Sequence, residues 1–146
     1  MKNKLSIIAV VLLSIMAYFN NGTNNTKSNT NSSISKSNLT LQDAYNQHKS
    51  NIIIKTKATV IKTLSDDLKG SKHQRFIIKI PSGQTILVAH NIDLAPRVNG
   101  LKKGSNIELK GEYEYNDKGG VIHWTHKDPN NRHPDGWIKY NNKTYQ

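Results

Sequence analysis

The alternation of apolar and polar residues along the chain predicts a small protein built from β-strands. Residues 51–64 are rich in Ile, Val and Thr, and their even positions are mostly apolar while Lys and Thr stand between them. Residues 106–115 alternate more regularly, with Ile, Leu, Gly and Tyr on one face and Glu and Lys on the other. A strand as long as 51–64 needs a bend or bulge, as the first strand of a small barrel does.

Three more strands and a short helix are predicted between clear turn signals. The strands are 74–80, 85–90 and 120–126, and residues 137–145 are predicted to form a terminal hairpin. Pro and Gly in residues 81–84 favour a hairpin turn. Thr40 can cap the free amides at the start of a helix. Asp43, three positions later, supports this start because an acidic residue is favourable at the positive end of a helix.

The order of these elements predicts an all-β fold: a small five- to six-stranded closed barrel of the oligonucleotide/oligosaccharide-binding (OB) type, with a short N-terminal helix. The connection 91–105 lies where an OB barrel usually carries its helix. Here it has room for at most one helical turn before Pro96. A β-sandwich usually has about seven strands and therefore fits less well.

The first 38 residues are predicted to lie outside this barrel. Two lysines precede an almost wholly apolar run in residues 1–19, as in a secretory signal peptide, and a retained signal-anchor is the alternative. The run is shorter than the ~20 apolar residues of a membrane-spanning helix, so we expect no stable membrane domain unless it is retained. Residues 20–38 are predicted to be a disordered linker, which leaves 39–146 as the barrel domain. We expect an exported protein, periplasmic or secreted.

The composition adds a basic excess and excludes disulfides. The chain has no Cys, so burial alone must stabilise the domain. Its formal charge is +11, and without the four lysines of the first 38 residues 17 cationic and 10 acidic residues leave +7. This charge favours anionic partners such as nucleic acid or anionic glycans. The alternative explanation of the charge is that lysines spread along the chain simply keep a small protein soluble. We expect the protein to be a monomer.

Residues 119–137 concentrate the chemically useful side chains, because they hold three of the six His and both Trp. Imidazoles and carboxylates bind zinc and similar ions, so His90, Asp93 and His123 are candidate ligands of a divalent metal. His126, Asp128 and His133 extend this group. On a continuous strand His123 and His126 point to opposite faces, so both can contribute only if the strand ends or bulges. The alternative is that these histidines bond loops to the backbone.

A second group surrounds the predicted 81–84 hairpin. If its strands pair, His73 and Gln74 lie beside His90 and Asn91. Arg75 and Arg97 are two of three arginines, and each either binds an anion or clamps an aspartate. Trp124 offers a stacking surface or fills the core. The predicted binding residues are His73, Gln74, Arg75, His90, Asn91, Asp93, Arg97, His123, Trp124, His126, Asp128 and His133.

Two functions fit these residues. The first is binding of an anionic polymer, nucleic acid ahead of glycan, with no cofactor required. The second is metal-assisted hydrolysis of phosphodiesters, in which aspartates hold a divalent ion, a histidine acts as base, and Arg75 or Arg97 stabilises the transition state. The aspartates considered are Asp66, Asp67, Asp93 and Asp128. Their spacing singles out none of them, so the sequence leaves open whether the protein is an enzyme.

Several long motifs resemble a known family. The segments DDLKGSKHQRFI, SGQTILVAHNIDLAPR, GLKKGSNIELKGEYEYN and GGVIHWTHKDP, with GWI and a final Tyr-Gln, are similar to a family of short exported bacterial proteins described as a domain of unknown function. The resemblance covers residues 51–146. It implies an exported bacterial protein with an OB-like barrel, and it carries no established activity.

Overall fold

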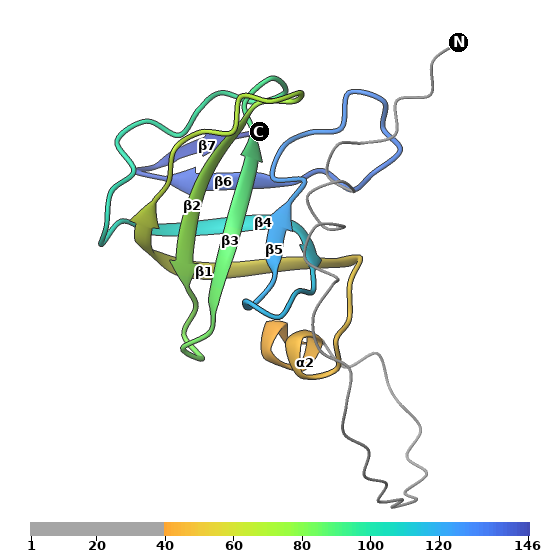
Figure 1. The fold of residues 1–146 in the computed structure, drawn as a ribbon. Helices are drawn as coiled ribbons and strands as arrows, with labels where there is room; N and C mark the ends of the chain where they lie inside the picture. The colour runs from red at the N-terminus through yellow and green to blue at the C-terminus, as the bar shows by residue number, and fades with distance from the viewer. Residues whose placement is uncertain (1–39) are drawn as a thin grey trace, which may run out of the picture. The chain divides into compact units, whose positions relative to one another are not determined.

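The computed structural model describes residues 40–146, which form one short helix and seven strands (Figure 1). The elements are α2 (Leu41–Asn46), β1 (Ile52–Thr63), β2 (His73–Lys79), β3 (Thr85–Asn91), β4 (Asn106–Glu114), β5 (Val121–His123), β6 (Trp137–Tyr140) and β7 (Lys143–Tyr145). The predicted signal segment 1–19 and linker 20–38 lie outside the described residues and stay predictions. Among residues 40–146 the helix α2 has only six residues, and nothing helical there could span a bilayer.

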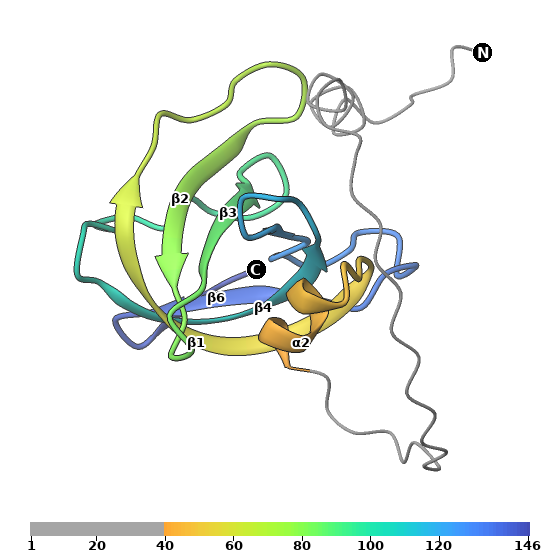
Figure 2. The same ribbon diagram turned by 60° about the horizontal axis from the view of Figure 1, so that its bottom comes forward.

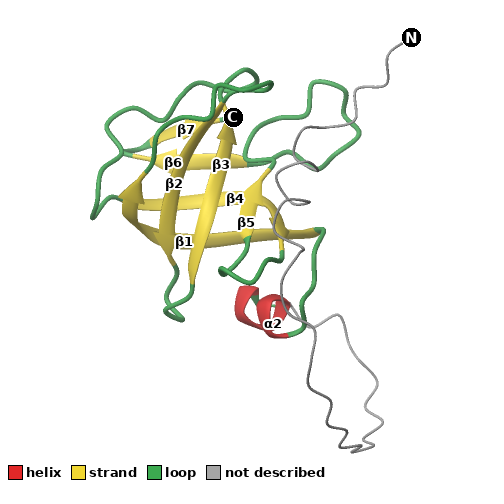
Figure 3. Cartoon of the chain, viewed as in Figure 1, coloured by secondary structure: helices red, strands yellow, loops and turns green. Residues whose placement is uncertain are grey.

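Five strands close into a barrel, which confirms the predicted all-β, OB-like architecture (Figure 3). The hydrogen-bonded order is β1-β2-β3-β5-β4, and β1 also pairs with β4 and so closes the sheet on itself. The β3–β5 pair is parallel and the other neighbours are antiparallel. β6 pairs with β4, and β7 pairs with β6, so the predicted terminal hairpin extends the sheet beyond the barrel.

Closure of the barrel depends on the long first strand, which pairs with two neighbouring strands. Residues 52–59 of β1 pair with β4, and residues 59–63 pair with β2. The register with β2 shifts between Val60 and Lys62, which is the predicted bulge. A bulge bends a strand and increases its twist, so β1 can pass from one half of the barrel to the other.

Helix α2 covers one end of the barrel (Figure 2). Thr40 and Asp43 form a reciprocal capping box at its start, as the sequence predicts. Leu41 and Ala44 are buried in the barrel core, and the Tyr45 hydroxyl donates to the Asp117 carbonyl across 3.4 Å. The helix is therefore attached by its apolar face and by one polar contact.

The interior is filled by alternate side chains of every barrel strand, and the residues between them face outward. The buried apolar core comprises Leu41, Ala44, Ile54, Ala58, Val60, Phe76, Ile78, Ile80, Ile86, Val88, Val98, Ile107, Leu109, Tyr113, Ile122, Ile138 and Tyr145. On β4 this alternation leaves Glu108, Lys110, Glu112 and Glu114 on the outer surface. The polar sites described below depend on this outer face.

Two local features differ from, or refine, the prediction. The fifth strand ends at His123 rather than running to residue 126, because Trp124 has a φ of 52°, which is incompatible with an extended strand. The connection 92–105 contains turns and no helix. This agrees with the prediction that the connection has room for at most one helical turn.

Candidate functional site

Four side chains gather on the outer surface of β4 and β5, and we call them the Glu/His cluster: Glu112, Glu114, His123 and His133. Glu112 and Glu114 are successive outward residues of β4, and the β4–β5 register puts His123 opposite Glu112. The His123 Nε2 atom lies 3.5 Å from Glu112 Oε1 and 3.7 Å from Glu114 Oε1. Within residues 40–146, no other group of three His, Asp or Glu side chains has ligand atoms that converge in this way.

The loop 124–136 brings the fourth member, His133, over this surface. The loop leaves β5 at Trp124 and returns to β6 after Gly136, whose amide donates to the His126 carbonyl across 2.9 Å. A Cβ at residue 136 would overlap the Trp124 carbonyl oxygen and lie 2.7 Å from that of Lys110. Only glycine fits the base of the loop, so the loop is drawn tightly onto β4.

Asp128 organises the interior of this loop. Its carboxylate accepts hydrogen bonds from the backbone amides of Asn130, Arg132 and His133, at 3.0, 2.7 and 2.9 Å. These bonds, that of Asn130 first, hold the pKa of Asp128 below its ordinary value. Asp128 therefore sets the path of the backbone that carries His133, and its oxygens are already occupied.

The His133 ring is held in a defined orientation. It stacks on Trp124 with ring centroids 4.0 Å apart and an interplanar angle of 12°. Its Nδ1–H donates to the Pro134 carbonyl across 2.9 Å, and its Nε2 lies 2.6 Å from Glu112 Oε2. His133 thus fixes one oxygen of Glu112, and the other oxygen faces His123.

Burial governs the electrostatics of the cluster. Burial lowers the pKa of His123, against the opposing effect of the Glu112 carboxylate, and the imidazoles of His133, His73 and His126 lower it further. Burial also raises the pKa of Glu114, and the neighbouring Glu112 adds to this. The His123 Nε2 atom is buried and has no hydrogen-bond partner. An unpaired buried nitrogen beside two carboxylates is an arrangement that a cation would complete.

The predicted metal ligands His90, Asp93 and His123 are not brought together. His90 is fully buried inside the barrel, whereas His123 is on the outer face. The Nε2–H of His90 donates to the Pro96 carbonyl across 3.1 Å, and Nδ1 accepts from the Thr125 hydroxyl across 2.8 Å. Burial lowers the pKa of His90 to about 4. His90 is therefore a neutral histidine that joins two connections, the alternative that the sequence had left open.

The residues of the second predicted group lie next to one another, but their side chains bond to backbone groups of the protein itself. The register pairs His73 with Asn91 and Gln74 with His90, as expected. Gln74 is buried and bonds both the amide and the carbonyl of Val98, at 2.9 and 3.0 Å. Asn91 accepts from the Asp93 amide, and the exposed Asp93 accepts from the Lys72 amide across 2.8 Å.

The two arginines hold the connection between β1 and β2. The Arg75 Nε–H donates to the Ser65 carbonyl across 3.0 Å, and Arg97 forms an ion pair with Asp66. Asp67 accepts from the Lys69 amide. The aspartates and arginines considered for phosphodiester chemistry are thus engaged within loops. His126 likewise is buried, and its Nδ1–H donates to the Lys127 carbonyl across 2.7 Å.

Glu112 and Glu114 are not among the site residues predicted from the sequence. Both belong to the regular polar face of β4, which looks like an ordinary solvated surface. The available signal was a Glu-x-Glu pair on a strand joined by a tight turn to a strand containing His123, because antiparallel neighbours bring such side chains together.

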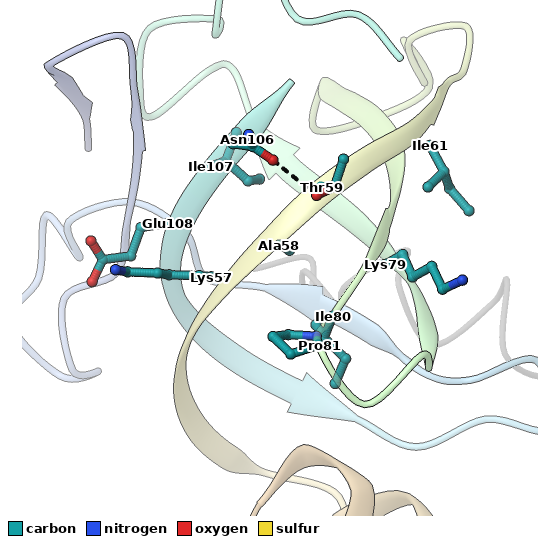
Figure 4. A pocket seen from close by; sticks show the side chains of 10 residues that line it. All are labelled: Lys57, Ala58, Thr59, Ile61, Lys79, Ile80, Pro81, Asn106, Ile107 and Glu108. Atoms are coloured by element: carbon teal, nitrogen blue, oxygen red, sulfur yellow. Dashed lines mark hydrogen bonds between the residues drawn. The ribbon is translucent and has the colours of Figure 1, made fainter. Parts of the chain in front are cut away.

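A second polar surface, which we call the basic face, lies beside the cluster on β1, β4 and β6. It consists of Lys55, Lys57, Lys110, Trp137 and Lys139. The Nζ atoms of Lys139 and Lys55 lie 4.6 and 5.5 Å from the centre of the Trp137 ring. The face continues into a cavity of about 640 Å³ where β1 passes from β4 to β2 (Figure 4).

Comparison with known proteins identifies the family. The family described as "Protein of unknown function (DUF3465)" matches residues 25–146, which include the whole barrel. No curated protein and no solved structure matches the chain. The long motifs of the sequence and the family match agree, and the chain therefore belongs to the DUF3465 family.

Proposed function

We propose that the domain binds an anionic polymer, nucleic acid ahead of anionic glycan, on the basic face. One observation carries this proposal: Trp137 lies on an outer sheet surface, and the ammonium groups of two lysines, Lys139 and Lys55, lie 4.6 and 5.5 Å from the centre of its ring. An aromatic ring beside cations is the arrangement that binds single strands, because bases stack on the ring and phosphates pair with the cations.

The sheet register arranges these side chains in two rows. Lys55, Lys110 and Trp137 are paired neighbours across β1, β4 and β6. The next outward row is Lys57, Glu108 and Lys139. Lys55 forms a 3.2 Å ion pair with Glu108, which reduces the positive charge without reversing it. Four lysines against one glutamate leave a net positive surface that is complementary to a polyanion.

The cavity beside this face gives the polymer a second point of attachment. Lys57 and Lys79 are among the residues that line it, and so are the buried Ala58, Ile80 and Ile107 (Figure 4). Apolar walls with a few polar groups are typical of ligand cavities. A base or sugar ring in this cavity would leave its phosphate near one of the two lysines, whose side chains extend in opposite directions (Figure 4).

We further propose that the protein acts as a monomer outside the cytoplasm, periplasmic or secreted. The support is the apolar run of residues 5–19 after a basic start. Detection of the processed protein in the extracytoplasmic fraction of cells would agree with this, and retention of the full chain in the cytosol would contradict it.

Fluorescence anisotropy with a labelled oligothymidylate and a labelled heparin oligosaccharide tests the binding proposal. We expect binding whose log affinity falls against log salt with a slope of roughly −2 to −3, because a single strand contributes about −0.7 for each phosphate neutralised. Trp137→Ala should weaken DNA binding about tenfold, in line with the loss of one base stack. Lys139→Glu should weaken binding of both polymers.

Lys118→Glu is the matched control, since Lys118 is an exposed lysine in the β4–β5 turn and lies away from the basic face. It introduces the same change of charge and should weaken binding much less than Lys139→Glu. Equal effects of the two variants would contradict a localised face. Absence of binding to either polymer at low salt would refute the function, and preference for heparin would reverse the order of the two ligands.

Metal-assisted hydrolysis of the bound polymer is the second candidate function. It is favoured by the position of the Glu/His cluster, because Glu112 is the next outward residue of β4 after Lys110, roughly 7 Å along the strand. A metal ion there can activate water and stabilise charge on a phosphate. Phosphodiester cleavage that chelator abolishes and a divalent metal restores would support this role. Lack of cleavage with Zn²⁺, Mn²⁺ or Mg²⁺ would exclude it.

A further inference from the structure

We infer that Glu112, Glu114 and His123 form a binding site for one zinc ion, and that His133 orients Glu112 within it. Imidazole and carboxylate are ordinary zinc ligands, and three protein ligands leave a fourth position for water. All three side chains project from paired strands rather than from a long loop. Their Cα positions are therefore set by the sheet, and the site does not depend on binding for its assembly.

The ligand types favour zinc, because imidazole is an ordinary zinc ligand whereas Mg²⁺ and Ca²⁺ take oxygen ligands, and the distances are compatible with one zinc ion. Two ligand atoms each about 2.1 Å from a tetrahedral ion lie about 3.4 Å apart, whereas neighbouring ligands of octahedral Mg²⁺ lie about 3.0 Å apart. The His123 Nε2 atom is 3.5 Å from Glu112 Oε1 and 3.7 Å from Glu114 Oε1. These separations are too long for good hydrogen bonds, and they match two edges of a tetrahedron around an ion.

The state of His123 points to the same ion. Its Nε2 atom is buried without a hydrogen-bond partner, although two carboxylates lie directly in front of it. A buried polar atom without a partner is costly, and native structures rarely keep one without a reason. A zinc ion bound between Nε2 and the two carboxylate oxygens would satisfy this nitrogen.

His133 provides the outer support that metal ligands usually have. Its Nε2 lies 2.6 Å from Glu112 Oε2, which directs the other oxygen, Oε1, toward His123. The ring of His133 is itself fixed by Trp124 and by the Pro134 carbonyl. Outer partners of this kind hold a ligand in place and raise metal affinity. His133 is thus a positioning residue rather than a ligand.

Competition with a chromogenic zinc chelator tests the site in purified protein that carries no histidine tag. We expect one zinc ion per chain. His123→Ala and the isosteric Glu114→Gln should each lower zinc affinity more than about 100-fold. His133→Ala should lower it about tenfold, at the lower end of the effect of losing an outer partner.

Two matched controls use residues outside the cluster. His48→Asn removes a histidine that stacks on Tyr115, and Asp93→Asn removes a carboxylate that accepts one backbone hydrogen bond. Both should keep the zinc affinity of the parent protein. Zinc should also raise the Tm of the parent protein and of the controls but not that of His123→Ala, and melting without zinc shows that each variant folds.

Cobalt substitution reports the geometry. Tetrahedral Co²⁺ gives intense visible absorption bands and octahedral Co²⁺ gives weak ones, so intense bands that His123→Ala abolishes would support the site. Weak bands, failure to bind zinc at micromolar concentration, or zinc binding that survives both His123→Ala and Glu114→Gln would overturn it. These measurements use no polymer, so their failure is distinguishable from failure of the basic-face proposal.

Discussion

The buried His90 should make the stability of the barrel depend on pH. His90 has no exposed surface, and it bonds the Pro96 carbonyl and the Thr125 hydroxyl in its neutral form. Burial lowers its pKa from 6.5 to about 4, and the nearby imidazoles of His126 and His73 add to this. Protonation inside the barrel would place an unpaired charge in an apolar surrounding.

The sign and size of the effect follow from these two pKa values. The unfolded chain takes up a proton at His90 near pH 6.5, and the folded barrel does so only near pH 4. Between these values the unfolded state binds more protons, so the free energy of unfolding falls as the pH falls. Each pH unit is worth about 1.4 kcal/mol, so the full contribution is about 3 kcal/mol. About 2 kcal/mol of this should be lost between pH 7 and pH 4.5.

Urea unfolding at pH 7 and pH 4.5, for the parent protein and for His90→Gln, isolates this contribution. Glutamine can still donate to the Pro96 carbonyl and does not titrate, so the variant should be less stable at pH 7 but should lose about 2 kcal/mol less on acidification. Other titrating groups are shared by both proteins and cancel in the comparison. In addition, the NMR signals of the His90 ring should not titrate between pH 8 and pH 5.

Equal losses of stability in the two proteins would refute this reasoning. So would a His90 ring that titrates near pH 6.5, because the ring would then be accessible to water. Either result would mean that the barrel interior opens around β3 more readily than its packing indicates.

Three further predictions concern single contacts. Gln74→Leu leaves the buried amide and carbonyl of Val98 unpaired and should lower the free energy of unfolding by about 2–4 kcal/mol in urea titrations. An unchanged stability would show that water replaces the glutamine. Asp128→Ala removes the acceptor of three loop amides and should weaken zinc binding about tenfold in the chelator assay, and unchanged affinity would refute its role in the loop. Gly136→Ala puts a methyl group against the Trp124 carbonyl and should lower the free energy of unfolding by about 1–3 kcal/mol in the same urea assay. No loss of stability would mean that the base of the loop is not closely packed.

Local patterns were sufficient to predict most of the fold. The alternation in residues 106–115 gave β4 its correct inner and outer faces, because a strand side-chain period of two is visible without knowledge of its partners. The turn at residues 81–84 was equally clear, since Gly83 has a φ of 93° that favours glycine. The bulge in β1 followed from its length and from the need to close a barrel.

The candidate site depended on information that is not local. Glu112 meets His123 only through the β4–β5 register, and His133 arrives only because the chain leaves the strand at Trp124. A positive φ at a tryptophan has no signal in composition, since this region of backbone conformation usually belongs to glycine or asparagine. The buried position of His90, by contrast, can be predicted from the sequence. His90 continues the alternation of Ile86 and Val88 and therefore faces the core.

The two proposed sites are neighbours because one edge of β4 is shared between two partners. Residues 112–114 of β4 pair with β5, and residues 108–110 pair with β6. The loop 124–136 therefore starts beside the cluster and ends beside the basic face, a shift of one side-chain step along β4. Because Gly136 bonds the His126 carbonyl and packs against the carbonyls of Trp124 and Lys110, the loop carries His133 back over Glu112 instead of projecting into solvent. The same glycine thus sets the position of His133 at the zinc site and of Trp137 on the basic face, so that a defect at the loop base should impair zinc binding and polymer binding together.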